Sequence, residues 1–220
     1  MGDRESRSVL VIGATGLVGR ECIRLLSIDP TCSRIVALTR HDGNVFPMSR
    51  KLDVDVVDFE NLAEHAGLFA VDQIICAMGT TVRQTPSRDA YRRIDFGYPL
   101  EAARLGLQHG ATHYLVVTAV GADSGSRIFY NRLKGELEDA LSLLDYPSLT
   151  IARPSVLIGD RAEPRRSEKI AWKLSFMTPK KYKPVPAANV ANALVTAARD
   201  NVPGLRIIQN AEMIQAPPNS

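Results

Sequence analysis

A tyrosine and a lysine four residues apart, Tyr130 and Lys134, are placed for acid–base chemistry. They lie at the start of a segment with helical spacing, so both side chains project from one face of the predicted helix. A phenol can give a proton to the alkoxide that develops when a carbonyl is reduced, and a nearby ammonium lowers the pKa of that phenol. Thr118 ends a predicted strand and offers a hydroxyl for the substrate oxygen. The alternative is a tyrosine at the core edge beside a solvated lysine.

Glycines recur at every third position in the turn Gly13-Ala14-Thr15-Gly16-Leu17-Val18-Gly19, which follows an apolar segment. The first lets the chain turn out of a strand, the second lets the backbone approach a pyrophosphate, and the third lets the next helix pack closely. Free N–H groups at the helix N-terminus would face the anion. The turn predicts dinucleotide contacts at Gly13, Thr15, Gly16, Leu17, Val18 and Gly19. A tight strand–helix junction without a ligand is the alternative.

The end of the second predicted strand favours NADPH over NADH. Folds specific for NAD place a carboxylate there, which bonds the ribose 2′-hydroxyl and would repel a 2′-phosphate. Here the strand ends in Thr39-Arg40, and a guanidinium can bind a phosphate through two hydrogen bonds. The alternative for Arg40 is a solvated loop cation. Asp58, after the third predicted strand, is expected at the adenine edge.

Short apolar segments alternate with longer amphipathic segments, which is typical of a parallel sheet with crossover helices. The predicted strands are 8–12, 34–39, 54–57, 73–77, 113–118, 148–153 and 205–209. The predicted helices are 17–28, 87–109 with a bend near Tyr98-Pro99, 130–144 and 190–199. We therefore predict an α/β fold. It is a doubly wound parallel sheet of the Rossmann type, with helices on both faces and a short variable C-terminal substrate segment.

Length and composition favour one domain of an ordinary globular protein. The chain has 220 residues, of which 45% are hydrophobic and 23% charged, and its net charge of +3 does not point to nucleic acid. We expect one NAD(P)-binding domain over 1–215, a substrate-side segment mainly within 155–186, and a disordered tail at 216–220. No apolar run approaches the ~20 residues that cross a bilayer, and the N-terminus lacks a signal-peptide pattern.

Cys22, Cys32 and Cys76 are scattered, without the spacing of metal ligands. Their apolar neighbours favour reduced thiols in the core. The four histidines form no metal-spaced cluster either. We therefore expect no metal site and a cytoplasmic protein.

Five segments taken in order resemble the short-chain dehydrogenase/reductase superfamily, and within it the atypical NAD(P)-binding members of the HTATIP2 group. These segments are 13–19, 76–81, 120–123, 130–136 and 153–157. The resemblance implies NADPH binding, Tyr130 as acid/base, and Lys134 as the residue that binds the nicotinamide ribose and tunes Tyr130. It also implies cofactor contacts at Ala77, Met78, Gly79 and Pro154.

The likeness departs from the superfamily pattern at Thr118-Ala119, where a serine is usual. Alignment of the functional position with Thr118 keeps a hydroxyl, whereas alignment with Ala119 loses it. Asp95 and Asn131 are further candidates for supporting polar roles.

The leading prediction is an NADPH-dependent oxidoreductase that acts on the carbonyl or alcohol of a small molecule. An alternative is a non-catalytic NADPH-binding regulatory protein that engages a protein partner. The basic segment 161–183 favours this alternative, although such a run can also be a solvated face. A sugar-nucleotide epimerase is disfavoured, because only roughly 65 of the residues follow Pro154 and leave little room for a nucleotide-sugar domain. The resemblance also allows a homodimer.

Overall fold

The computed structural model describes residues 6–42, 46–80, 85–159 and 179–215. These residues form a seven-stranded sheet in the order β3-β2-β1-β4-β5-β6-β9, with every neighbouring pair parallel. The strands are β1 (Arg7–Ile12), β2 (Cys32–Thr39), β3 (Leu52–Val56), β4 (Gln73–Cys76), β5 (His113–Val117), β6 (Ser148–Arg153) and β9 (Gly204–Gln209). A short pair, β7 (Leu157–Ile158) and β8 (Val185–Pro186), forms a second sheet. The predicted α/β fold class is confirmed.

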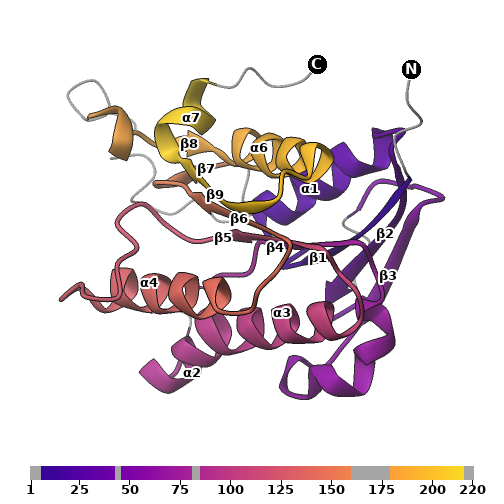
Figure 1. The fold of residues 1–220 in the computed structure, drawn as a ribbon, viewed down its shortest axis with the longest axis horizontal. Helices are drawn as coiled ribbons and strands as arrows, with labels where there is room; N and C mark the ends of the chain where they lie inside the picture. The colour runs from indigo at the N-terminus through magenta and orange to yellow at the C-terminus, as the bar shows by residue number, and fades with distance from the viewer. Residues whose placement is uncertain (1–5, 43–45, 81–84, 160–178, 216–220) are drawn as a thin grey trace.

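Helices cover both faces of the large sheet (Figure 1). One face is covered by α1 (Leu17–Ile28) and α6 (Ala187–Asp200), with α7 (Asn210–Gln215) beside them. The other is covered by α3 (Tyr98–Gln108), α4 (Phe129–Ser142) and the 3-10 segment η1 (Phe59–Phe69), with α2 (Arg88–Arg92) leading into α3. A three-residue 3-10 turn, η5 (Lys180–Tyr182), precedes β8.

The central strand β1 shows why both layers are needed. Successive side chains of a strand point to opposite faces. Val9 and Val11 accordingly pack in the cluster with α1 and α6, whereas Leu10 and Ile12 pack in the cluster with α3 and α4. All four side chains are fully buried. A continuous apolar run therefore forms a strand buried on both faces.

The long helical segment 87–109 is interrupted just before the predicted bend at Tyr98-Pro99. It consists of α2, a π-helical turn η3 (Arg93–Gly97) and α3, which begins at Tyr98. Proline has no N–H for the carbonyl four residues earlier, so the regular α-helical ladder cannot continue through Pro99. The wider turn buries the side chain of Asp95.

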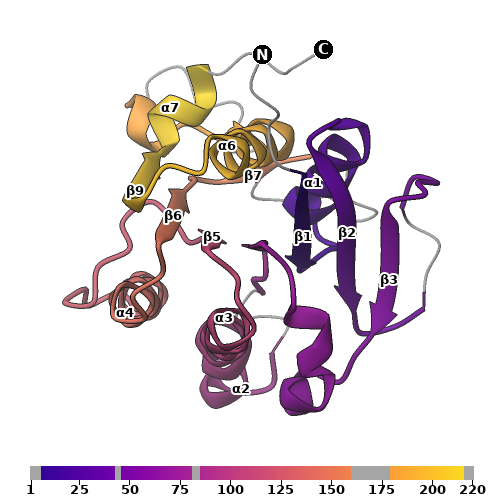
Figure 2. The same cartoon turned by 45° about the vertical axis from the view of Figure 1, so that its right-hand side comes forward.

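All strands of the large sheet end at one edge, as the aligned arrows of β1, β2 and β3 show in Figure 2. The strand order reverses between β1 and β4, because β2 lies on one side of β1 and β4 on the other. Ligands of open α/β sheets bind at the carboxyl ends of strands beside such a reversal. The loops after β1, β4, β5 and β6 therefore position the candidate site.

Parts of three sequence predictions lie outside the described residues. The substrate-side segment 155–186 is described over 155–159 and 179–186. The basic segment 161–183 is described only over 179–183, so Arg161, Arg165, Arg166, Lys169 and Lys173 are not covered. The predicted tail 216–220 is not covered either. Cys22, Cys32 and Cys76 are free, buried thiols, as expected.

Candidate functional site

The turn after β1 has the geometry that its glycines predict. Gly13 has a positive φ of 75°, and a Cβ there would lie 2.6 Å from the carbonyl oxygen of Ala77. A Cβ on Gly19 would lie 2.2 Å from the carbonyl oxygen of Gly13, so α1 packs directly against the turn. Gly16 caps α1, whose first turn has neither a side-chain cap nor an acidic residue. The helix N-terminus is thus open to an anion.

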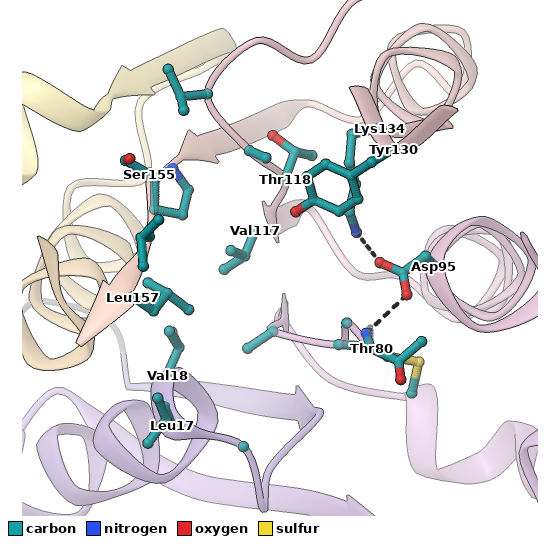
Figure 3. A pocket seen from close by; sticks show the side chains of 18 residues that line it. Leu17, Val18, Thr80, Asp95, Val117, Thr118, Tyr130, Lys134, Ser155 and Leu157 are labelled. Carbon is teal, nitrogen blue, oxygen red and sulfur yellow. Dashed lines mark hydrogen bonds and ion pairs between the residues drawn. The ribbon is translucent and has the colours of Figure 1, made fainter. Parts of the chain in front are cut away.

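A cavity of about 410 Å³ opens beside this turn, at the carboxyl ends of β4, β5 and β6 (Figure 3). Ten of the predicted site residues line it: Gly16, Leu17, Val18, Ala77, Met78, Gly79, Thr118, Tyr130, Lys134 and Pro154. These residues come from four separate loops, from the start of α1 and from α4. The fold therefore brings together the phosphate turn and the predicted catalytic pair.

A second cleft of about 230 Å³ continues the site towards β2. Gly13, Thr15 and Arg40 line it, together with the aromatic rings of Phe59 and Tyr98, whose centroids are 5.7 Å apart. The two cavities share four lining residues: Gly16, Ala77, Met78 and Gly79. Together they form an elongated site across the strand reversal, with aromatic and basic groups at one end and Tyr130 at the other.

Lys134 lines the larger cavity and is held there in a buried ion pair. Its Nζ is 2.7 Å from Oδ1 of Asp95, and the two side chains are 3% and 1% exposed. Burial opposes the charge of Lys134, but the charge of Asp95 and the neighbouring phenol of Tyr130 outweigh it, so the pKa of Lys134 is raised. Tyr130 is more open, and Figure 3 shows its ring projecting into the cavity beside Lys134.

Thr118 lies at the predicted place but already has a partner. Its hydroxyl donates to Oε1 of Glu138 over 2.6 Å, and the Nε of Arg153 donates to the same carboxylate over 3.1 Å. The single hydroxyl proton of Thr118 is therefore engaged, although its oxygen can still accept a hydrogen bond. Ala119 also lines the cavity and carries no polar group.

Two predicted cofactor residues line neither cavity. Gly19 packs behind the phosphate turn, and Asp58 caps η1. Hydrogen bonds from the Glu60 N–H and the Asn61 side chain hold the pKa of the exposed Asp58 carboxyl below its usual range. The predicted adenine contact of Asp58 stays a prediction.

Several residues of the site were missed or left unassigned. Glu138 follows Tyr130 and Lys134 at the same four-residue spacing along α4, so the helical period could have identified it. Asp95 reaches Lys134 from the distant η3 turn, and no local pattern predicts that contact. Asn131, the other supporting candidate, lies against the turn at Gly121, and its carbonyl accepts the N–H of Asp123.

Among the residues that the structure covers, no helix is both long and apolar enough to cross a membrane. No cluster of three or more His, Cys, Asp and Glu side chains suited to a metal ion occurs in those ranges.

Several known proteins are similar to this chain. Solved structures with the same fold include the enzyme WbmG of Bordetella bronchiseptica in complex with NAD, with a TM-score of 0.72, 12% identity, and coverage of 96% of this chain and 75% of WbmG. UDP-glucose 4-epimerase of Thermotoga maritima has a TM-score of 0.71 and 13% identity, with coverage of 92% of this chain and 76% of that enzyme. At these identities the likeness shows the fold.

Similarity in sequence is closer. Protein FMP52, mitochondrial, of Candida albicans is 29% identical over 206 residues, which are 90% of each chain. Protein HTATIP2 of Rattus norvegicus is 30% identical over 197 residues, 89% of this chain and 79% of HTATIP2. No protein-family model matches the chain. The relation to HTATIP2 extends over most of both proteins, and this chain belongs to the HTATIP2 family of atypical short-chain dehydrogenase/reductases.

Proposed function

We propose that this protein is an NADPH-dependent oxidoreductase that reduces a small-molecule carbonyl or oxidises the corresponding alcohol. The observation that carries the proposal is that Tyr130 and Lys134 line the same cavity as the glycine turn. The family relation and the fold shared with NAD-bound WbmG support it. The test is to titrate the protein with NADPH and NADH, and then to follow NADPH oxidation with a panel of carbonyl compounds.

The residues present fit a nicotinamide dinucleotide. Side chains at Gly13 and Gly19 would collide with backbone, so the turn keeps a bare cradle against an open helix N-terminus. We propose that this cradle holds the pyrophosphate, that Thr15, Arg40 and Asp58 bind the adenosine half, and that Ala77, Met78, Gly79 and Pro154 flank the nicotinamide half. Bound NADPH would supply a hydride to the substrate carbon.

The chain's own residues supply the proton and the charge. Tyr130 donates its phenolic proton to the substrate oxygen, where negative charge develops. The ammonium of Lys134 stabilises the phenolate that remains, and also binds the nicotinamide ribose. A low dielectric inside the cavity strengthens these charge interactions. In alcohol oxidation the same groups act in reverse.

Arg40 is the proposed determinant of the preference for NADPH. Replacing Arg40 with Ala should raise the Kd for NADPH by about 10–100-fold, because a charge-assisted hydrogen bond contributes about 1.5–3 kcal/mol. The Kd for NADH should not change. Fluorescence titration measures both values, and Arg34→Ala is the control, because this exposed arginine of β2 pairs with Asp53. A wild-type protein that binds NADH more tightly than NADPH would refute the cofactor assignment.

Thr118 is the proposed hydroxyl that orients the substrate oxygen. It can accept the hydroxyl proton of an alcohol substrate while it donates to Glu138, but it must turn its own proton away from Glu138 to bind a carbonyl oxygen. We expect Thr118→Val to lower stability by about 1–3 kcal/mol, because a buried carboxylate loses a donor. Turnover should fall as well, and Thr118→Ser should restore both properties. Thermal unfolding and steady-state kinetics separate the two effects. If Thr118→Val is less stable but fully active, Thr118 does not orient the substrate, and its role is only to donate a hydrogen bond to Glu138.

A second candidate is a regulatory protein that binds NADPH without turnover and engages a protein partner. The engagement of the Thr118 hydroxyl by Glu138 favours it, because that proton is not free for a substrate carbonyl. Tight NADPH binding without NADPH oxidation across the carbonyl panel would select this candidate. A pull-down with and without NADPH would then seek the partner.

Other proposals concern the state of the protein in the cell. We propose a single domain over 1–215, a cytoplasmic location and a homodimer as the possible assembly. FMP52 of Candida albicans is named as mitochondrial, so cell fractionation is the direct test of location. Light scattering decides the oligomeric state.

A further inference from the structure

The ion pair between Asp95 and Lys134 uses both oxygens of a buried carboxylate. Oδ1 of Asp95 is 2.7 Å from Nζ of Lys134, and Oδ2 accepts the backbone N–H of Thr80 over 2.9 Å. Figure 3 shows Asp95 between these two partners at the edge of the cavity. The carboxylate thus joins α4 to the loop after β4, whose residues Ala77–Gly79 form the shared wall of both cavities.

The helix that carries Asp95 departs from regular geometry at this residue. Asp95 is in the π-helical turn Arg93–Gly97, between two α-helical segments. Such turns are rare and are frequently found at functional sites. A buried carboxylate is costly in free energy unless it is paired. The fold therefore has both an unusual backbone turn and a buried carboxylate at the point where Asp95 contacts Lys134.

Several titratable groups face this ion pair from the surrounding elements. Tyr130 lies one turn before Lys134 on α4, and the buried thiol of Cys76 lies on β4. On α2, burial and the nearby charge of Asp95 raise the pKa of the Tyr91 phenol. Burial alone would lower the pKa of Lys134, and the charge of Asp95 is the largest influence that raises it. Among these groups Asp95 is the carboxylate, and its negative charge compensates the positive charge of the Lys134 ammonium.

We propose that Asp95 is a positioning residue that holds Lys134 as an ammonium, in a fixed place beside Tyr130, and so sets the high-pH limit of the reaction. The inference rests on the proposed roles of Tyr130 and Lys134. Asp95 also accepts a hydrogen bond from the backbone N–H of Thr80, and so it fixes the position of the loop after β4 relative to α4. Without Asp95, the buried Lys134 loses its proton at a lower pH, and it then no longer stabilises the phenolate of Tyr130.

The test is the protonation of Lys134 in Asp95→Asn. This variant has nearly the same shape, and its side-chain oxygen can still accept the N–H of Thr80. NMR of protein labelled with ¹⁵N-lysine follows the Lys134 amine over a range of about pH 6 to 10, and Lys134→Met assigns its signal. We expect wild-type Lys134 to stay charged over the whole range and Lys134 of Asp95→Asn to titrate within it. Asp53→Asn, at an exposed ion pair, is the control and should behave as wild type.

Kinetics give a second measurement. The alkaline limb of NADPH oxidation should move to lower pH in Asp95→Asn, with about tenfold less charged Lys134 for each pH unit above the new midpoint. In a Lys134→Met background, Asp95→Asn should add no further pH effect, because Asp95 acts through Lys134. Asp95→Ala, which leaves room for water, repeats the test if the Asn variant fails to fold.

Different results would overturn the positioning role of Asp95 and the proposed oxidoreductase reaction. A Lys134 that stays charged across the range in both Asp95 variants overturns the positioning role, whatever the activity. A protein that never oxidises NADPH overturns the proposed reaction. In that case the NMR titration still decides whether Asp95 controls the charge of Lys134.

Discussion

Tyr130→Phe should lower the turnover of any carbonyl compound that the wild-type protein reduces by about 10²–10⁴-fold, which is the usual contribution of a general acid. NADPH affinity should be unchanged, because the phenylalanine ring keeps the shape of the cavity wall and removes only the hydroxyl. The reason for the loss is that the substrate oxygen has no proton donor when the hydride arrives. Steady-state kinetics measure the first effect and fluorescence titration the second.

The matched control is Tyr146→Phe. The hydroxyl of Tyr146 donates to the carbonyl oxygen of Ala103 over 2.6 Å, and Tyr146 precedes β6, at the edge of the sheet opposite the site. Its loss should cost about 1 kcal/mol of stability and leave turnover intact. Turnover at the wild-type rate in Tyr130→Phe would remove Tyr130 from the mechanism and favour the non-catalytic candidate.

Gly19→Ala should lower the free energy of unfolding by about 3 kcal/mol, at the upper end of the usual cost of overpacking. The added Cβ would lie 2.2 Å from the carbonyl oxygen of Gly13 and 2.9 Å from the Cα of Ala14, and both are backbone atoms that cannot rotate away. The midpoint of thermal unfolding should fall by roughly 6–12 °C. NADPH binding should weaken too, because α1 can only make room by moving away from the phosphate turn.

Gly67→Ala provides a control of the same chemical change. Gly67 lies in η1, and a Cβ there would have nothing within 4 Å. This variant should be as stable as the wild type or slightly more stable, because alanine restricts the unfolded chain. If Gly19→Ala unfolded at the wild-type temperature, α1 could shift without cost and the close packing would not be required.

Local patterns in the sequence were sufficient for the strands of the large sheet and for the long α-helices. The apolar run before Gly13 predicted β1, and the prediction of 17–28 as a helix matches α1 (Leu17–Ile28). Such elements depend on nearest neighbours, because a buried strand needs a continuous apolar run and a covering helix needs an apolar stripe. Several elements were missed. α7 and the pair β7 and β8 have too few residues for a period to show. η1 has 11 residues, but its 3-10 geometry and the non-helical backbone at Asn61 and His65 break the α-helical period.

The site residues were also predicted from short patterns that are local in the sequence. Glycines at fixed spacing and a Tyr–Lys pair on one helix face can be read without a fold, because each motif lies within one or two turns of chain. The sequence could also place them in the order of a dinucleotide-binding protein. It could not tell whether Thr118 keeps a free hydroxyl, because its partner Glu138 lies on a different element.

The sequence by itself determined the parallel sheet, the phosphate turn and the identity of the predicted catalytic pair. Only the tertiary structure decided the surroundings of that pair. Asp95 forms an ion pair with Lys134, and Glu138 accepts a hydrogen bond from Thr118. The rings of Phe59 and Tyr98 line the far end of the cleft. These contacts join residues from separate elements. The charge of a buried lysine depends on what lies within a few ångströms of it in space, and a sequence pattern records only what is near it along the chain.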